Sequence, residues 1–409
     1  MPIPKLQAID STRAFFREGY AFIGRHGADL GSDAFETRLM LRRVVCMMGE
    51  DAARHFYDGR HFTRVGAMPT LTLRLLQDKG SVQSLDSAVH RARKAMFLDL
   101  LTGDEVSRIG KLFDARFAAA WDRWRHEPSV VLHDAIAELL CDVICAWAGV
   151  PVAGGTLAMR TREMTAMIDG AGTVGPRAWR GLLLRQRSER WARAMIAGAR
   201  RRREAAAGQP IERLARFRDL DGRLLDLTSA GVELLNLIRP TVAVARFITF
   251  AALALHEHPG TADWLRSDMK TRLPIFVQEV RRFYPFFPVI GGRVRQPFEW
   301  RDHQFALGDW VLLGLHATNH DPRLWDEPHR FRPERFIDRQ SSGFDLMPQG
   351  AGDHASDHRC PGEWFTIELI ERAVQQLLSR NYEVPQQPLA IPLNRFPTLP
   401  ESGFVIQVR

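Results

Sequence analysis

Apolar residues return at intervals of three and four positions over most of the first 280 residues, which is the pattern of helices with buried faces. The pattern is clearest in residues 130–149 and 225–255, and it predicts helices from about residue 34 to 282. Beyond that point prolines and glycines lead into short apolar runs, of which 304–307 and 310–313 are typical of strands. We therefore expect a mainly α fold, with a single large helical domain over residues 1–409 and a minor β region.

The composition is that of an ordinary globular chain. It has 409 residues, of which 45% are hydrophobic and 25% charged, and this is enough to bury a large core around a cofactor. The longest stretch without Asp, Glu, Lys or Arg is residues 143–159, which is too short and too interrupted by proline and glycine to span a bilayer. No apolar signal segment follows Met1, so we expect a cytoplasmic protein without a transmembrane segment.

The net positive charge of the chain comes from one segment. The formal net charge is +8, and residues 180–203 alone hold nine arginines and a single acid, Glu189. A distributed nucleic-acid footprint is therefore not expected. The segment is predicted to be an amphipathic helix with a solvated basic face, while binding to nucleic acid, an anionic membrane or an acidic partner are the alternatives.

A glycine-rich loop near the C-terminal end holds the most distinctive chemistry. Residues 349–363 contain Cys360 directly before an apolar helix predicted over 364–378. A cysteine at a helix start lies near N–H donors and the positive end of the helix dipole, which favour the thiolate form that ligates iron. The alternatives are an inert loop cysteine and a zinc site formed by His354, His358 and Cys360, for which no fourth ligand lies nearby.

Two further motifs precede this loop. Glu279 and Arg282 lie three residues apart on one helical face, and Arg335 lies in the segment 326–336. In their order and spacing, these motifs and Cys360-Pro361-Gly362 resemble the cytochrome P450 superfamily. The resemblance implies a cytochrome P450 fold that binds haem b through Cys360 as the axial thiolate ligand of the iron. It also implies a structural ion network of Glu279, Arg282 and Arg335.

The same resemblance assigns further contacts to the cofactor. His90 and Lys94 share a helical face and stand where the superfamily has a His-x-x-x-Arg pair that contacts the haem propionates. Lysine can still meet a carboxylate as a point charge, without the two-point geometry of arginine. Arg359, beside the cysteine, is expected to be another cofactor-binding residue.

Arg239 and Pro240 stand where most members of the superfamily have an acid followed by an alcohol, which disfavours an oxygen-activating monooxygenase. No acid lies three or four residues from Arg239, so its partner must come from elsewhere. Either a distant protein carboxylate or a substrate carboxylate would satisfy it, and the second matches the two parallel donors of arginine. Pro240 removes one backbone donor, so a local kink that opens the pocket is expected.

The Arg-Pro pair, the inserted loop 350–358 and the segment 174–177 look like the fatty-acid peroxygenase branch of the superfamily. In that branch hydrogen peroxide is the oxidant, no redox partner is required, and the substrate carboxylate acts as general acid–base. The resemblance implies a peroxide-dependent oxidoreductase that hydroxylates fatty acids at the 2- or 3-position. It assigns catalytic roles to Arg239, Pro240 and Gln83, and substrate contacts to Arg239, Gln83, Phe286, Phe287, Val289 and Val174.

The preferred product and two other functions remain open. Glutamine at position 83 favours hydroxylation over decarboxylation to terminal alkenes, while Gln77, Gly172 and Phe287 depart from the branch and reshape the pocket. A reductase-dependent monooxygenase would use the basic segment to dock an acidic redox partner. A third possibility is a haem or lipid-binding protein without enzymatic activity.

Overall fold

The computed structural model describes residues 3–77, 80–202 and 208–409. Its helices are α1 (Thr12–Glu18), α2 (Phe22–Asp29), α3 (Glu50–Tyr57), α4 (Thr70–Leu76), α5 (Ser87–Leu100), α6 (Gly103–Trp124), α7 (Leu132–Ala148), α8 (Gly155–Gly170), α9 (Pro176–Arg201), α10 (Pro210–Ala215), α11 (Leu227–Ala243), α12 (Ala245–Glu257), α13 (Thr261–Ser267), α14 (Met269–Phe283), α15 (Leu315–Asn319) and α16 (Glu363–Leu378). Short 3₁₀ helices lie at η1 (Gly19–Ala21), η2 (Val82–Ser84) and η4 (Pro333–Phe336).

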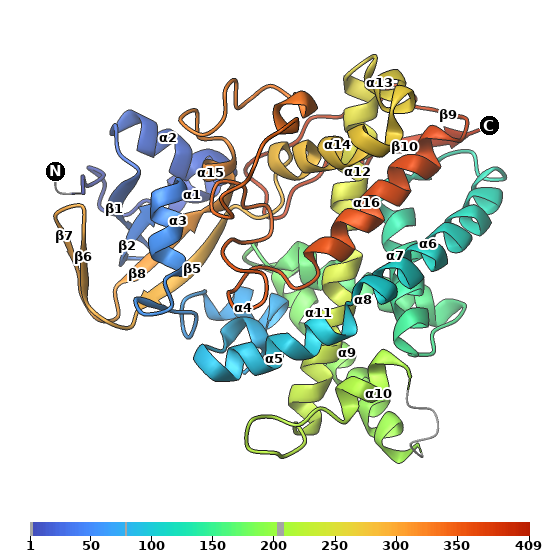
Figure 1. Ribbon diagram of the computed structural model, residues 1–409, viewed down its shortest axis with the longest axis horizontal. Coiled ribbons are helices and arrows are strands. Elements are labelled where there is room, and N and C mark those ends of the chain that lie inside the picture. Colours follow the sequence, from blue (N-terminus) through green and yellow to red (C-terminus); the bar gives the residue numbers. More distant parts are fainter. Residues whose placement is uncertain (1–2, 78–79, 203–207) are drawn as a thin grey trace.

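The strands are shorter. Most of them gather at one side of the molecule, while the strands nearest the C-terminus lie at the other side, beside the long helices (Figure 1). They are β1 (Ala34–Leu39), β2 (Arg42–Met47), β3 (Phe62–Thr63), β4 (Val130–Val131), β5 (Val289–Val294), β6 (Phe298–Trp300), β7 (His303–Phe305), β8 (Trp310–Gly314), β9 (Tyr382–Glu383) and β10 (Val405–Val408). The predicted mainly α fold with a minor β region is confirmed.

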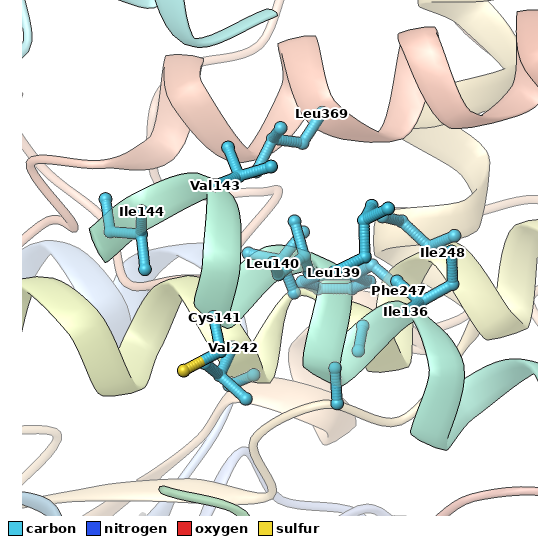
Figure 2. Close-up of a cluster of buried hydrophobic side chains, with 14 of the residues drawn as sticks. Ile136, Leu139, Leu140, Cys141, Val143, Ile144, Val242, Phe247, Ile248 and Leu369 are labelled. Carbon is cyan, nitrogen blue, oxygen red and sulfur yellow. The ribbon is translucent and has the colours of Figure 1, made fainter. Parts of the chain in front are cut away.

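The main core forms where α7 meets the long helices of the chain. Helix α7 is buried on almost every side, as its apolar sequence predicts, and it ends at Gly149, whose φ of 78° suits glycine. Figure 2 shows side chains of α7 packed against Val242 of α11, Phe247 and Ile248 of α12, and Leu369 of α16. This packing fixes the position of α11 relative to α16, the helix that follows the cysteine loop.

Helices α11 and α12 form one long apolar segment through this core. The Asp226 side chain caps its start by accepting the backbone N–H groups of Thr228 and Ser229. Residues 227–257 are long and apolar enough to cross a membrane, but 94% of the most apolar window is buried inside the protein, as in the core helix of a soluble protein. The helix continues through Pro240 and is interrupted at Val244, four residues beyond the predicted kink.

The largest sheet corrects the prediction of helix from residue 34 onward. Its strand order is β1-β2-β8-β5-β3, and β2 runs parallel to β8 with Cys46 opposite Leu312. In β1 the side chains of Phe35, Thr37 and Leu39 are buried while Glu36 and Arg38 between them are more exposed, which is strand alternation. The turn residues Met40 and Leu41 both adopt positive φ, a conformation usually marked by Asn or Gly, so the sequence carries no hairpin signal.

The basic segment lies mostly on α9, as predicted, although Arg203 lies outside the described residues. Arg180, Arg187 and Arg190 are exposed to solvent. Arg185 is instead buried, where it pairs with Glu189 at 2.6 Å and donates to the Leu75 carbonyl at 3.1 Å. The helix is therefore amphipathic, with one of its arginines used to attach α4.

Candidate active site

Cys360 lies in the loop before α16 with its backbone N–H donating to the Gln349 carbonyl at 3.1 Å. Burial raises the pKa of its thiol to about 11, while the Gly362 amide, Lys94 and Arg281 act in the opposite direction. The predicted effect of nearby donors is therefore present, but burial outweighs it. A bound metal cation reverses this balance, because a coordinating thiol is deprotonated outright.

A buried ion cluster supports the cysteine loop. Glu363, the first residue of α16, accepts from Arg281 of α14 and from Arg359 Nε, the latter at 2.5 Å. Burial alone would raise the pKa of Glu363, but the two guanidinium groups lower it to about 2. Arg359, predicted to bind the cofactor, is thus held by a carboxylate on the helix that follows Cys360.

Helix α5 connects this loop to α11 through adjacent residues. Lys94 Nζ donates to the carbonyls of Asp357 and Arg359 in the cysteine loop, the second at 2.8 Å. Arg93 donates from its Nη1 to Glu233 of α11 at 2.8 Å. In Figure 1 the loop before α16 comes close to α5, in agreement with these contacts. Helix α5 therefore ties the cysteine loop to α11, and a ligand of Cys360 would lie near both helices.

His90, one turn before Lys94, is buried and stacks on His358 with ring centroids 3.8 Å apart. Burial, together with His358 and Lys94, lowers the pKa of His90 to about 3, so its imidazole is neutral near pH 7. A neutral imidazole retains one N–H donor. The ammonium group of Lys94 has three hydrogens, of which its two loop contacts use two. The predicted pair thus retains donors suited to carboxylates.

Arg239 lies on α11 at the end of a chain of polar contacts. Its Nη2 donates to the Leu76 carbonyl and, at 2.9 Å, to Asn236 Oδ1. Asn236 Nδ2 donates to Glu233 Oε2 at 2.9 Å, and Glu233 is fully buried. Glu233, Asn236 and Arg239 lie at intervals of three residues on one helical face. The ion pair of Arg93 with Glu233 is therefore connected through Asn236 to the guanidinium of Arg239.

Gln83 is joined to the same network through its neighbour. The Val82 N–H donates to Glu233 Oε1 at 2.9 Å, which fixes η2 against α11. Gln83 Oε1 is buried and, in the part of the chain that the structure describes, has no hydrogen-bond partner. Such an acceptor is costly unless a ligand or water donates to it. Glu233 thus accepts hydrogen bonds from Val82, the neighbour of Gln83, and from Asn236, which contacts Arg239.

Pro240 is exposed although both neighbours in the chain are buried. Asn236 and Ala243, which share its helical face, are at most 9% exposed. A single exposed residue on an otherwise buried part of a helix is expected where the helix borders an internal space. Cys360 is also partly exposed although burial dominates the pKa of its thiol, so it borders such a space as well.

The predicted apolar substrate contacts are not all brought to this space. Phe286 stacks on Phe247 of α12 with ring centroids 4.2 Å apart, and Val289 is partly buried at the start of β5. Phe287 is 40% exposed. Val174, in the loop before α9, is 76% exposed, and the structure does not join it to Arg239 or Gln83.

The structure joins Glu279, Arg282 and Arg335 in one ion network. Arg282 forms a two-point pair with Glu279 on α14, with N–O distances of 2.7 and 2.8 Å, and both side chains are fully buried. Arg335 of η4 adds a third contact to Glu279 at 3.3 Å. Arg282 also donates to the carbonyls of Asn319 and Pro328, so the pair fastens the segment before the cysteine loop to α14.

We expect Arg282→Met to lower the free energy of unfolding by about 3 to 5 kcal/mol, because it leaves the Glu279 carboxylate buried with one partner removed. Arg332→Met is the control, since Arg332 is one-third exposed and pairs with exposed acids, and should cost about 0 to 1 kcal/mol. Denaturant unfolding of both variants measures the difference. Equal small losses would contradict a supporting role for the buried network.

The zinc alternative receives no support. The described residues contain no group of three or more His, Cys, Asp and Glu side chains placed to hold a metal ion. His358 stacks on His90 instead. The donors do fit haem: Cys360 offers sulfur to an internal space, Pro240 borders such a space on α11, and His90 and Lys94 offer donors for propionates. These residues would hold the cofactor, with Arg359 steadying the loop.

Comparison with known proteins agrees with this fit. Residues 265–407 match the family model of cytochrome P450. Curated relatives include cytochrome P450 71A8 of Mentha piperita, 27% identical over 45% of this chain, and tabersonine/lochnericine 19-hydroxylase of Catharanthus roseus, 32% identical over 27% of it. The chain spans only 38% and 22% of the lengths of these two proteins.

Solved structures match nearly the whole chain. Cytochrome P450SP alpha (CYP152B1), seen as variants and in complex with (R)-ibuprophen, is 40% identical over 98% of each chain, with a TM-score of 0.94. Cytochrome P450EX alpha (CYP152N1) with myristic acid is 36% identical over 100% of this chain and 98% of the other, with a TM-score of 0.93. Cytochrome P450 OleT is 30% identical over 100% and 99%, with a TM-score of 0.95.

The chain therefore belongs to the cytochrome P450 superfamily and is a haem-thiolate oxidoreductase. Its neighbours within that superfamily confirm the prediction that it is a member of the fatty-acid peroxygenase branch.

Several supporting residues were not predicted from the sequence. The contacts that orient Arg239 come from Asn236, Glu233 and Arg93. The ion pair that supports the Cys360 loop joins Arg281 to Glu363. Glu233, Asn236 and Arg239 at intervals of three in an apolar helix were a usable signal, because polar side chains on one buried face must satisfy one another. The pairs with Arg93 and Arg281 join distant parts of the chain and leave no local pattern.

Proposed function

We propose that this protein hydroxylates fatty acids at the 2- or 3-position with hydrogen peroxide. The substrate carboxylate, held by Arg239, would act as the general acid–base. The observation that carries the proposal is a buried guanidinium on α11 beside Pro240, an exposed residue in the buried part of that helix, in place of an acid and an alcohol. The structural relative with myristic acid supports a fatty-acid substrate.

Each side chain of the site would have its own role in the reaction. Arg239 would bind the carboxylate with two parallel N–H donors, Nη1 and Nη2, of which Nη2 would give up its contact with the Leu76 carbonyl, while Asn236 holds the guanidinium orientation through the other hydrogen of Nη2. The bound carboxylate would then accept and return the proton of the peroxide at a fixed position. Haem, when bound through Cys360, supplies the oxidising chemistry. Gln83 Oε1 would accept a hydrogen bond in the same pocket and favour hydroxylation over decarboxylation.

Further parts of the proposal concern the whole protein. It would act as one domain over residues 1–409, in the cytoplasm, without a redox partner or nucleic acid. Phe286, Phe287 and Val289 would contact the alkyl chain, and Val174 would do so if its loop closes over the substrate. The solvated basic face of α9 would have no part in the reaction.

The experiment is product analysis of the haem-loaded protein with a mixed pool of fatty acids. Hydrogen peroxide alone should give 2- or 3-hydroxy acids, as identified by mass spectrometry. Products formed only with an electron-donating reductase would contradict the proposal. Terminal alkenes as the main product would keep the role of the carboxylate but replace hydroxylation by decarboxylation.

Short carboxylic acids that do not fill the pocket should act as decoys. Such an acid would occupy Arg239 and supply the missing acid–base, so peroxide would then oxidise an added substrate that has no carboxylate. The measurement is product formation from that substrate with and without the short acid. Equal product without the acid would show that peroxide activation needs no carboxylate.

A further inference from the structure

The side-chain amide of Gln349 contacts the sulfur that ligates the cofactor. Its Nε2 lies 3.7 Å from Cys360 Sγ, within the range for a hydrogen bond to sulfur, and its backbone carbonyl accepts the Cys360 N–H at 3.1 Å. One residue therefore holds both the backbone and the sulfur of the cysteine. No motif in the sequence points to a role for Gln349 beyond its place in the loop.

The surroundings fix which end of the amide faces the sulfur. Arg281 Nη2 lies 3.2 Å from Gln349 Oε1, and because a guanidinium can only donate, the amide oxygen must face Arg281. The NH₂ group then faces Cys360 and Thr366. The Thr366 hydroxyl donates to the Gly362 carbonyl at 3.0 Å, which leaves its oxygen to accept from Gln349 Nε2 at 3.2 Å.

Each amide hydrogen thus has its own acceptor, one on Thr366 and one on Cys360. Arg281 is itself held in place, because it is 1% exposed and pairs with Glu363 and with Gln278 Oε1 at 2.7 Å. The amide cannot rotate without leaving buried polar groups unsatisfied. The donor directed at the sulfur is therefore built into the fold.

We propose that Gln349 is a positioning residue that donates a hydrogen bond to the Cys360 thiolate and weakens its donation of electrons to iron. Hydrogen bonds from neighbouring residues are one of the levers by which a protein sets the reduction potential of its haem. A donor that withdraws charge from the sulfur stabilises the reduced iron and raises that potential. The inference rests on the haem-thiolate assignment and not on the choice of substrate or oxidant.

The test is a potentiometric titration of the ferric/ferrous couple in the haem-loaded protein without substrate. Gln349→Met keeps the length of the side chain and removes the donor, so its potential should be more negative and its iron–sulfur stretching frequency higher. Gln278→Met is the matched control, because Gln278 also accepts from Arg281 but has no described contact with Cys360. Its potential and stretching frequency should match those of the wild type.

Gln349→Glu serves if the methionine variant folds poorly, because it keeps an acceptor toward Arg281 and has no N–H at neutral pH. Its potential should also be more negative than that of the wild type. Wild-type values in the glutamate variant or in a folded methionine variant would overturn the proposal. An equal shift in Gln278→Met would overturn it too, since the effect would then come from Arg281.

Discussion

Arg239→Ala is expected to weaken fatty-acid binding by about 2 to 5 kcal/mol, the range for removing one partner of a buried charge pair. It should also slow peroxide-driven turnover at saturating substrate, because the carboxylate would lose its fixed position. Arg239→Lys should restore binding in part and turnover less, since an ammonium group lacks the planar two-point geometry. Spectral titration with fatty acid and product formation measure the two effects separately.

A second buried arginine on the same long helical segment is the control. Arg246 of α12 is 2% exposed and pairs with Asp169, so Arg246→Ala should cost stability without a comparable loss of affinity. Arg239 also donates to the Leu76 carbonyl, and both variants must therefore be shown to be folded and haem-loaded first. Unchanged affinity and turnover in Arg239→Ala would leave only a structural role for this residue.

Cys360→Ala is expected to abolish peroxide-driven oxidation even if the protein retains haem. The variant removes the thiolate, which donates electron density to the iron and favours cleavage of the O–O bond. The wild-type carbonyl complex of the reduced protein should absorb at the long wavelength typical of thiolate ligation, and the variant should not. Cys46→Ala is the control, because Cys46 is buried in β2 among apolar side chains, and its spectrum should stay unchanged.

A wild-type spectrum of the histidine-ligated type, in protein shown to be native, would contradict the assignment of Cys360. So would full peroxide-driven turnover in Cys360→Ala.

The long helices were predictable because their apolar positions repeat over many turns, as in α7 and α11. The hairpin of β1 and β2 was not, because Met40 and Leu41 occupy turn positions that usually carry Asn or Gly. Its register is instead fixed by long-range pairing, such as that of Cys46 with Leu312 in β8. The residues around Cys46 in the sequence do not indicate which distant strand it pairs with.

In the site too, local motifs were predictable from the sequence and contacts between distant segments were not. Cys360, Glu279 and Arg282 were found because their spacing is local and resembles that of a family. The contact of Gln349 with Arg281 joins two elements 68 residues apart, and the pair of Arg93 with Glu233 joins elements 140 residues apart. Exposure of Val174 is likewise set by how its loop packs, which the sequence alone does not determine.

The central claim is that the substrate's own carboxylate, held by Arg239, is the acid–base of the reaction. The most direct test compares a fatty acid with its methyl ester, which keeps the chain and removes the ionised carboxylate, using hydrogen peroxide as the only oxidant. The account predicts hydroxylated product from the acid and only background oxidation of the ester. Equal rates of product formation from acid and ester would contradict it.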